Sequence, residues 1–316
     1  MSTLTTQQRE LAARLGDLTG ESVDQVVARV GSDELRSANT KLSPRIPQLL
    51  ATQFVAAGVT DGSPYVVLPT GRIFYGLPSA PSHVRQHRLL RGLLDERIPE
   101  ECFVCALDVV YRYVADRTVS VELLPGRDGT IVEVGAYLGH KGMRMMDASI
   151  GTTGRYVGIE MLPDNCGLMA RNFAENGFDN AVVVPEGVWR EPDVMDVMGK
   201  GRQRHSLVDI DAGRLSDPTG YTVPVNPLHD ILARTLPAEA VVDFMYVSVN
   251  GAELEALDGL GDWAQRIRTI YVAANYDRDG EATSGRVGAQ LAALGFYLPD
   301  PGSSGRSLTG LRRICP

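Results

Sequence analysis

The sequence predicts an α/β fold in which a doubly wound, mainly parallel sheet follows a mostly helical N-terminal region. From Thr130 onward, short runs of β-branched residues alternate with helical segments of about 10–15 residues, which is typical of βαβ units. The region before it shows helical periodicity with one β-like patch. We therefore expect two parts, residues 1–124 and residues 125–316.

The composition is that of a globular protein, since 44% of the 316 residues are hydrophobic and 22% are charged. The formal charge of -8 argues against a nucleic-acid partner, because binding to phosphates relies on Lys and Arg. No apolar run approaches the ~20 residues of a membrane span, and the polar N-terminus has no secretory signal pattern. We expect a cytoplasmic protein with a small-molecule partner.

The N-terminal part is predicted to be mostly helical, with one turn-rich patch between its helices. In chain order the pattern predicts helices at 5–16 and 22–30, a short hairpin within 61–78, and helices over 82–97 and from Pro99 onward. Apolar residues of the last helix recur at three- and four-residue steps, which gives it one buried face. We expect this part to act as a lid over the functional site or as the contact surface of a homodimer.

The second part supplies the strands of the sheet. The predicted strands are 130–136, 155–161, 180–188, 243–250, 267–276 and 295–299, with helices near 139–149 and 164–176 among the segments between them. The last connections are shorter, which predicts an antiparallel edge.

A nucleoside site is expected where the first strands end, because ligands of open parallel sheets bind outside the carboxyl ends of the strands. Gly135 and Gly139 allow a tight turn there, and Glu160 ends the next strand, where a carboxylate accepts hydrogen bonds from ribose hydroxyls. The spacing G-x-x-x-G-x-x-G departs from the dinucleotide pattern. Glu133, just before the turn, suits the ammonium and sulfonium of S-adenosylmethionine better than a pyrophosphate.

A zinc site is an alternative use of four N-terminal residues. Cys102 and Cys105 are spaced C-x-x-C, and His83 and His87 precede them at helical spacing. Both cysteines fall on the apolar face of their helix, where free cysteine behaves as a small buried hydrophobe. Three arginines flank the histidines and disfavour a cation. We therefore expect a structural role and no metal.

Four segments, in this order, resemble the FkbM-type class I methyltransferases, which use S-adenosylmethionine. The segments are IVEVGAYLGHKG (131–142), VGIEMLPDNCGLMARNFAENG (157–177), VPVNPLHDILA (223–233) and DFMYVSVNGAELEALDGL (243–260). The resemblance covers about residues 130–300 and implies a Rossmann-like fold. This chain has Ser248 and Asn250 where the family has Asp and Glu, and Glu253 matches the acid of the family's Gly-Ala-Glu turn.

The resemblance implies roles for individual residues. It places Glu133, Gly135 and Gly139 at the methionine end of the cofactor, Glu160 at the ribose and Glu186 near the adenine. The residues expected to bind S-adenosylmethionine are Glu133, Gly135, Tyr137, Gly139, Glu160, Glu186 and Ser248. Those expected to act on the acceptor are His229, Asp230, Asn250 and Asn275, as bases or as hydrogen-bond partners.

The resulting hypothesis is methyl transfer to a small hydroxylated or amine acceptor, such as a natural product, a sugar or a glycolipid head. Three alternatives stay open: transfer or cyclisation of the aminobutyrate chain with release of methylthioadenosine, a non-catalytic nucleoside-binding scaffold, and a nicotinamide dehydrogenase. We also expect Gly135→Val to abolish cofactor binding while leaving the fold largely intact.

Overall fold

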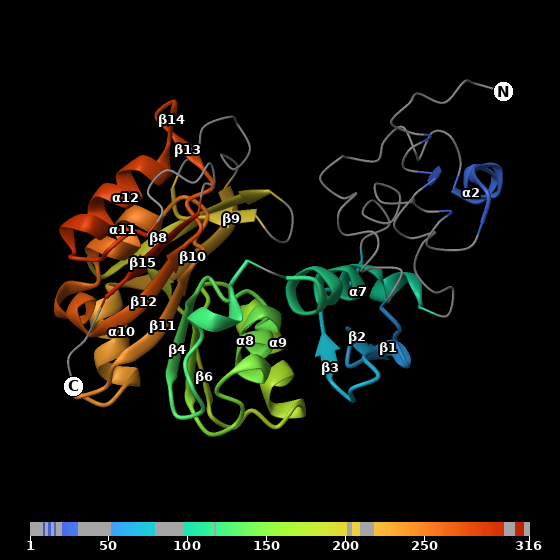
Figure 1. Ribbon diagram of the computed structural model, residues 1–316, viewed down its shortest axis with the longest axis horizontal. Coiled ribbons are helices and arrows are strands. Elements are labelled where there is room, and N and C mark those ends of the chain that lie inside the picture. The colour runs from blue at the N-terminus through green and yellow to red at the C-terminus, as the bar shows by residue number, and fades with distance from the viewer. Residues whose placement is uncertain are drawn as a thin grey trace. The chain divides into compact units, whose positions relative to one another are not determined.

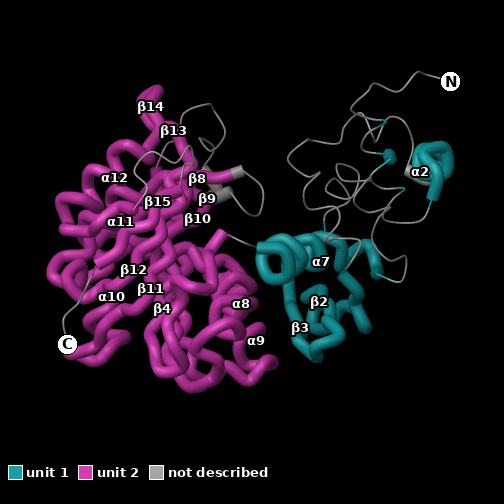
Figure 2. Tube along the Cα trace, in the orientation of Figure 1, with its two compact units in different colours: residues 1–117 teal, residues 118–316 magenta. Residues whose placement is uncertain are grey.

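The computed structural model divides the chain into two compact units, residues 1–117 and 118–316 (Figure 2). The division lies a few residues before the boundary expected at 124. The structure describes residues 9, 12, 13, 16, 21–30, 52–79, 98–116, 118–200, 204–208, 218–299 and 307–312. The helix expected over 82–97 lies outside these residues, and only four residues of the one expected over 5–16 are described.

The N-terminal unit contains α2 (Val23–Val30) and a small antiparallel sheet. Ser22 and Gln25 form a reciprocal cap, in which each backbone N–H donates to the other's side chain, so the predicted helix begins here. The sheet has three strands where the sequence predicted two. In order they are β1 (Ala56–Thr60), β2 (Ser63–Val67) and β3 (Ile73–Tyr75).

The helix expected from Pro99 consists of three consecutive segments with different hydrogen-bond patterns. It comprises the 3₁₀ turn η2 (Glu100–Cys102), α7 (Phe103–Val109) and the π-helical turn η3 (Val110–Val114). Cys102 and Cys105 are fully buried, and their thiols donate to the carbonyls of Gly58 and Phe74. Burial raises the pKa of both thiols, so they act as neutral donors. His83 and His87 lie outside the described residues, which hold no metal-ligating cluster.

The C-terminal unit contains a six-stranded sheet of order β15-β12-β11-β4-β5-β6 (Figure 1). All neighbouring strands are parallel except β15, which is antiparallel to β12. The strands are β4 (Thr130–Val134), β5 (Arg155–Ile159), β6 (Ala181–Val184), β11 (Val242–Val247), β12 (Ile267–Val272) and β15 (Leu308–Leu311). The fold is therefore the predicted doubly wound, mainly parallel α/β sheet.

Helices cover both faces of this sheet, because its central strands are apolar on both sides. One face packs on α10 (Leu228–Thr235), α11 (Glu253–Asp258) and α12 (Thr283–Ala293) in a continuous core. On the opposite face α8 (His140–Ala148) lies against Tyr156 and Tyr246. The helix α9 (Pro163–Glu175) packs beside it through Phe173, whose ring meets that of Tyr156 edge-on.

A second sheet, which the sequence did not predict, is inserted between β6 and β11. Its order is β7-β10-β8-β9, formed by β7 (Gly187–Val188), β8 (Asp193–Lys200), β9 (Arg204–Ser206) and β10 (Pro218–Asn226). The predicted strand 180–188 is divided between β6 and β7. The residues of β8 alternate between acidic and apolar only irregularly, so their pattern does not indicate a strand.

The C-terminal edge also differs from the prediction. Among the described residues, 295–299 pair through a single isolated bridge, between Tyr297 and Leu311, and the antiparallel edge strand is β15. A small hairpin of β13 (Asp277–Arg278) and β14 (Glu281–Ala282) follows β12. Within the residues that the structure describes, none of the helices has the length and apolar character of a membrane span.

Replacement of Gly142 should destabilise the C-terminal unit. A Cβ at this helical position would lie 2.3 Å from the phenolic oxygen of Tyr156, which is fully buried and cannot move aside. We expect Gly142→Ala to lower the free energy of unfolding by about 1–3 kcal/mol. The matched control is Gly167→Ala in α9, which has open space around it and should add about 0.5–1 kcal/mol. Denaturant unfolding measures both, and equal effects would contradict the packing of α8 on β5.

Candidate functional site

The order of strands reverses at the carboxyl ends of β4 and β11. The chain passes from β4 outward to β5 and β6, then returns to β11 on the other side of β4 and continues to β12. This arrangement defines the switch point at which open α/β sheets bind ligands. The Ser248 N–H donates to the Val134 carbonyl, so the two strand ends are tied together.

The chain itself requires the glycine at position 135. Gly135 has a φ of 82°, and a Cβ there would lie 2.1 Å from the carbonyl oxygen of Ser248. A valine would therefore displace the end of β11 from that of β4. The expectation that Gly135→Val leaves the fold largely intact is wrong for this reason, and the expected loss of cofactor binding stays a prediction.

The loop between β4 and α8 is held in a tightly curled conformation. Gly135, Tyr137 and Gly139 all have left-handed backbone conformations. The N–H groups of Gly135 and Ala136 donate to the Ile159 carbonyl at the end of β5, at 2.9 and 3.0 Å. A Cβ on Gly139 would lie 2.8 Å from the Phe173 ring, so this glycine permits α9 to pack against the loop.

Glu160 connects this loop to the end of β5. Its Oε2 accepts a hydrogen bond from the Tyr137 N–H at 2.9 Å. Its Oε1 accepts bonds from the Leu162 N–H and the Asn165 amide. The side chain is buried with only 7% exposed, so a fixed acceptor group stands beside the curled loop. The structure therefore brings Gly135, Tyr137, Gly139 and Glu160 together, and their binding of a cofactor stays a prediction.

Glu133 lies on the face of the sheet covered by α8. Its carboxylate accepts a hydrogen bond of 2.6 Å from the Tyr156 hydroxyl, and both side chains are buried. Burial, together with the negative charge of Glu133, raises the pKa of Tyr156 well above its usual value, so the phenol stays protonated as the donor.

Two further residues expected at the cofactor have partners within the protein. Glu186, after β6, accepts a hydrogen bond from the Asn226 amide and forms an ion pair with Arg234 of α10. Ser248 is half-buried and meets the glycine loop through its backbone.

The residues expected to act on the acceptor are dispersed. His229 and Asp230 are exposed in the first turn of α10, where the His229 N–H donates to Gly259 and its ring lies near Gly261. Asn275 is exposed after β12. Asn250 alone follows β11 at the switch point.

Asn250 joins three segments at the switch point. Its side-chain amide donates to the His205 carbonyl at 2.8 Å, and its Oδ1 accepts from the Tyr276 hydroxyl at 2.7 Å. Its own carbonyl accepts from the Ser206 hydroxyl at 2.7 Å. The residue is left-handed, with a φ of 52°, which Asn tolerates better than most residues. Sequence reasoning missed His205, Ser206 and Tyr276, because no local pattern brings β9 to this turn.

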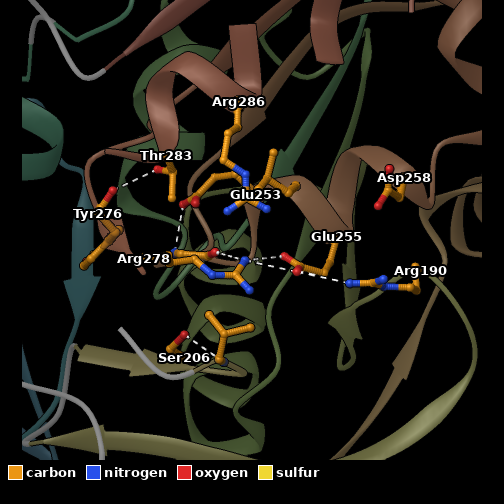
Figure 3. Close-up of polar contacts among 12 residues, drawn as sticks. Arg190, Ser206, Glu253, Glu255, Asp258, Tyr276, Arg278, Thr283 and Arg286 are labelled. Carbon is orange, nitrogen blue, oxygen red and sulfur yellow. Dashed lines mark hydrogen bonds and ion pairs between the residues drawn. The ribbon is translucent and has the colours of Figure 1, made fainter. Parts of the chain in front are cut away.

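A group of charged side chains contacts the turn after β11 (Figure 3), and the two carboxylates of this group are buried. Arg278 donates to both carboxylate oxygens of Glu255 and to the Gly251 carbonyl, and Arg190 also pairs with Glu255. Glu253 is fully buried, and its Oε1 accepts from the Gly251 N–H while its Oε2 has no hydrogen bond. Burial raises the pKa of Glu253 to about 7.

Comparison with known proteins gives distant likenesses to methyltransferases of known structure. The FkbM methyltransferase of Methylobacillus flagellatus is 12% identical, with a TM-score of 0.41 over 96% of this chain and 70% of that one. A precorrin-6y C5,15-methyltransferase from Geobacter metallireducens is 15% identical, with a TM-score of 0.36 over 58% of this chain and 71% of that one.

Aeropyrum pernix fibrillarin, solved with S-adenosylmethionine bound, is 12% identical, with a TM-score of 0.38 over 82% of this chain and all of that one. No protein-family model matches the chain, and no curated protein sequence matches it.

The buried Glu253 carboxyl predicts a pH-dependent stability. The folded state holds its proton up to about pH 7, whereas an unfolded carboxyl releases it near 4.5. Between these values the folded state binds more protons, so the free energy of unfolding falls as the pH rises, by about 3 kcal/mol in total. Glu253→Gln should lack this contribution, and the variant should gain about that much relative to the wild type between pH 4.5 and 7.5.

Denaturant unfolding at several pH values measures this difference. Exposed Glu239 provides the control, because Glu239→Gln changes the same chemical group without burial. A difference between Glu253→Gln and the wild type that stays constant with pH would show that the buried carboxyl is ionised throughout.

Proposed function

We propose that this chain is an S-adenosylmethionine-dependent methyltransferase of the FkbM type, with the cofactor at the switch point between β4 and β11. The observation that carries the proposal is the bond between the Glu160 carboxylate and the Tyr137 N–H. It sets an acidic group at the end of β5 directly beside the curled loop after β4. A nucleoside with an extended polar tail needs these two features side by side.

The residues present fit such a cofactor. Glu160 is a fixed acceptor, and the two ribose hydroxyls are donors. The loop of Gly135, Tyr137 and Gly139 offers backbone close to the ligand for the methionine end. Ser248 approaches this loop from the β11 side through its backbone carbonyl. Glu133 and Glu186 are proposed to act less directly, through Tyr156 and Arg234.

The cofactor supplies a methyl group that the sulfonium activates towards displacement. The chain must hold the acceptor in line at about 3–3.5 Å and exclude water. The net charge of -8 favours a small hydroxylated or amine acceptor over a nucleic acid. The N-terminal unit, with its own sheet, is proposed as a lid or a dimer contact.

Binding of S-adenosylhomocysteine tests the proposed site. Isothermal titration calorimetry should show binding to the full chain, and Glu160→Gln should weaken it at least tenfold, because one ribose acceptor is lost (about 1.4 kcal/mol). Asp164→Asn is the control, since it removes one exposed carboxylate of the α9 first turn. Equal affinity of the wild type and Glu160→Gln, or binding of a nicotinamide dinucleotide instead, would contradict the proposal.

Product analysis tests the reaction. Incubation with S-adenosylmethionine and hydroxylated acceptors should release S-adenosylhomocysteine. Release of methylthioadenosine would show that the aminobutyrate chain reacts instead, and binding without turnover of any acceptor would favour a scaffold.

A further inference from the structure

We propose that the inserted strand β9 lies on the acceptor side of the switch point between β4 and β11, and that the His205 imidazole takes the proton of an acceptor hydroxyl during methyl transfer. The inference rests on the proposed function and deepens it. It assigns a catalytic residue outside the segments that resemble the family, and it favours a hydroxyl as the acceptor group.

The first support is the attachment of β9 to the end of β11. Asn250 binds β9 through two hydrogen bonds. Its side-chain amide donates to the His205 carbonyl, and its backbone carbonyl accepts from the Ser206 hydroxyl. Tyr276, after β12, donates to the same Asn250 side chain and fixes its orientation. This attachment is rigid, because Ser206 is fully buried.

The second support is that Leu207, the residue after β9, is attached to the segment that follows β5. Leu207 belongs to a buried cluster with Leu162 and Met161, which directly follow Glu160. It also lies against Gly187 of β7. The chain at β9 is therefore fixed to segments that follow β11 and β5. Because β4 lies between these two strands in the sheet, the chain here passes over the carboxyl end of β4.

The alternation of side chains along β9 gives the direction of the imidazole. Ser206 faces Asn250, so His205, its neighbour within β9, faces the opposite side of the strand. His205 pairs with Gly199, so it shares a face of the second sheet with Val197, two residues along β8. Val197 is buried in one cluster with Leu162, which follows Glu160. His205 therefore lies on the face of the second sheet that packs on the segment after Glu160, beside which the cofactor is proposed.

The chemistry of His205 fits proton removal. The side chain is half-buried, and burial lowers its pKa, so the imidazole is neutral near pH 7 and has a nitrogen able to accept a proton. Among the residues that the structure describes, burial is the cause of that shift. Gly199 faces His205 across the β8–β9 ladder, and the titratable group on the Asn250 side is the Tyr276 phenol.

The step balances without another reactant. The acceptor oxygen forms a bond to the methyl carbon as the bond from that carbon to sulfur breaks, and sulfur keeps the electron pair. The hydroxyl proton passes to His205, which later releases it to water. The products are the methyl ether and S-adenosylhomocysteine.

The test compares full-chain His205→Gln with the wild type and with His229→Gln. None of the bonds that anchor β9 uses the imidazole, so His205→Gln should keep its melting temperature and its affinity for S-adenosylhomocysteine within threefold. Formation of S-adenosylhomocysteine from S-adenosylmethionine is measured with two hydroxyl probes, glycerol and methyl glucoside. The turnover of His205→Gln should fall about 10²–10⁴-fold.

The pH profile gives a second readout. The wild-type rate should rise with pH through a midpoint below 6.5, and His205→Gln should lack this rise. Asn250→Asp loses the amide that donates to the His205 carbonyl, so it should lower turnover without weakening cofactor binding. Should His205→Gln fail to fold, restoration of His205→Ala turnover by added imidazole tests the same role.

Two kinds of failure are distinguishable. A wild type that does not bind S-adenosylhomocysteine overturns the proposed function, and the inference with it. A wild type that binds it but turns over both probes no faster than His205→Gln overturns the inference alone, as does a loss of turnover confined to His229→Gln.

Discussion

The contact between the carboxyl ends of β4 and β11 is the constraint on which the candidate site depends. Gly135 approaches the Ser248 carbonyl so closely that no side chain fits between them, and the Ser248 N–H donates back to Val134. This contact joins the two halves of the sheet at the point where the strand order reverses, with β5 and β6 on one side and β12 on the other. It sets where the loop after β4 begins, and therefore how this loop meets the Ile159 carbonyl and the Glu160 carboxylate.

Glu160 shows how one group serves both the fold and a ligand. Its carboxylate is held by two backbone N–H groups and the Asn165 amide, so its rotamer is fixed before anything binds. A ligand that uses this acceptor does not have to order the side chain, and such preorganisation improves affinity. The same hydrogen bonds offset the cost of burying the charge.

The inserted sheet explains one departure from the FkbM-type pattern. An acid in place of Asn250 could accept the bond from Tyr276, but it could not donate to the His205 carbonyl. An amide does both, so Asn at this position is what attaches β9 to the turn after β11. The Glu255–Arg278 pair stabilises the same turn, because Arg278 also donates to the Gly251 carbonyl.

The sequence by itself determined the fold class and the position of the glycine loop. Strands such as β4 and β5 are short β-branched runs, and the turn at Gly135 follows directly from local residue type. It did not predict β8, β9 and β10, because the residues of β8 lack a regular alternation, β9 is only three residues long, and the strands are stabilised by pairing with one another. Nor could it bring His205 to Asn250, since 45 residues separate them and only tertiary packing joins them. The tertiary structure also decided which acids are engaged: Glu133 with Tyr156 and Glu186 with Arg234, because hydrogen bonds between distant segments depend on how the strands lie in space.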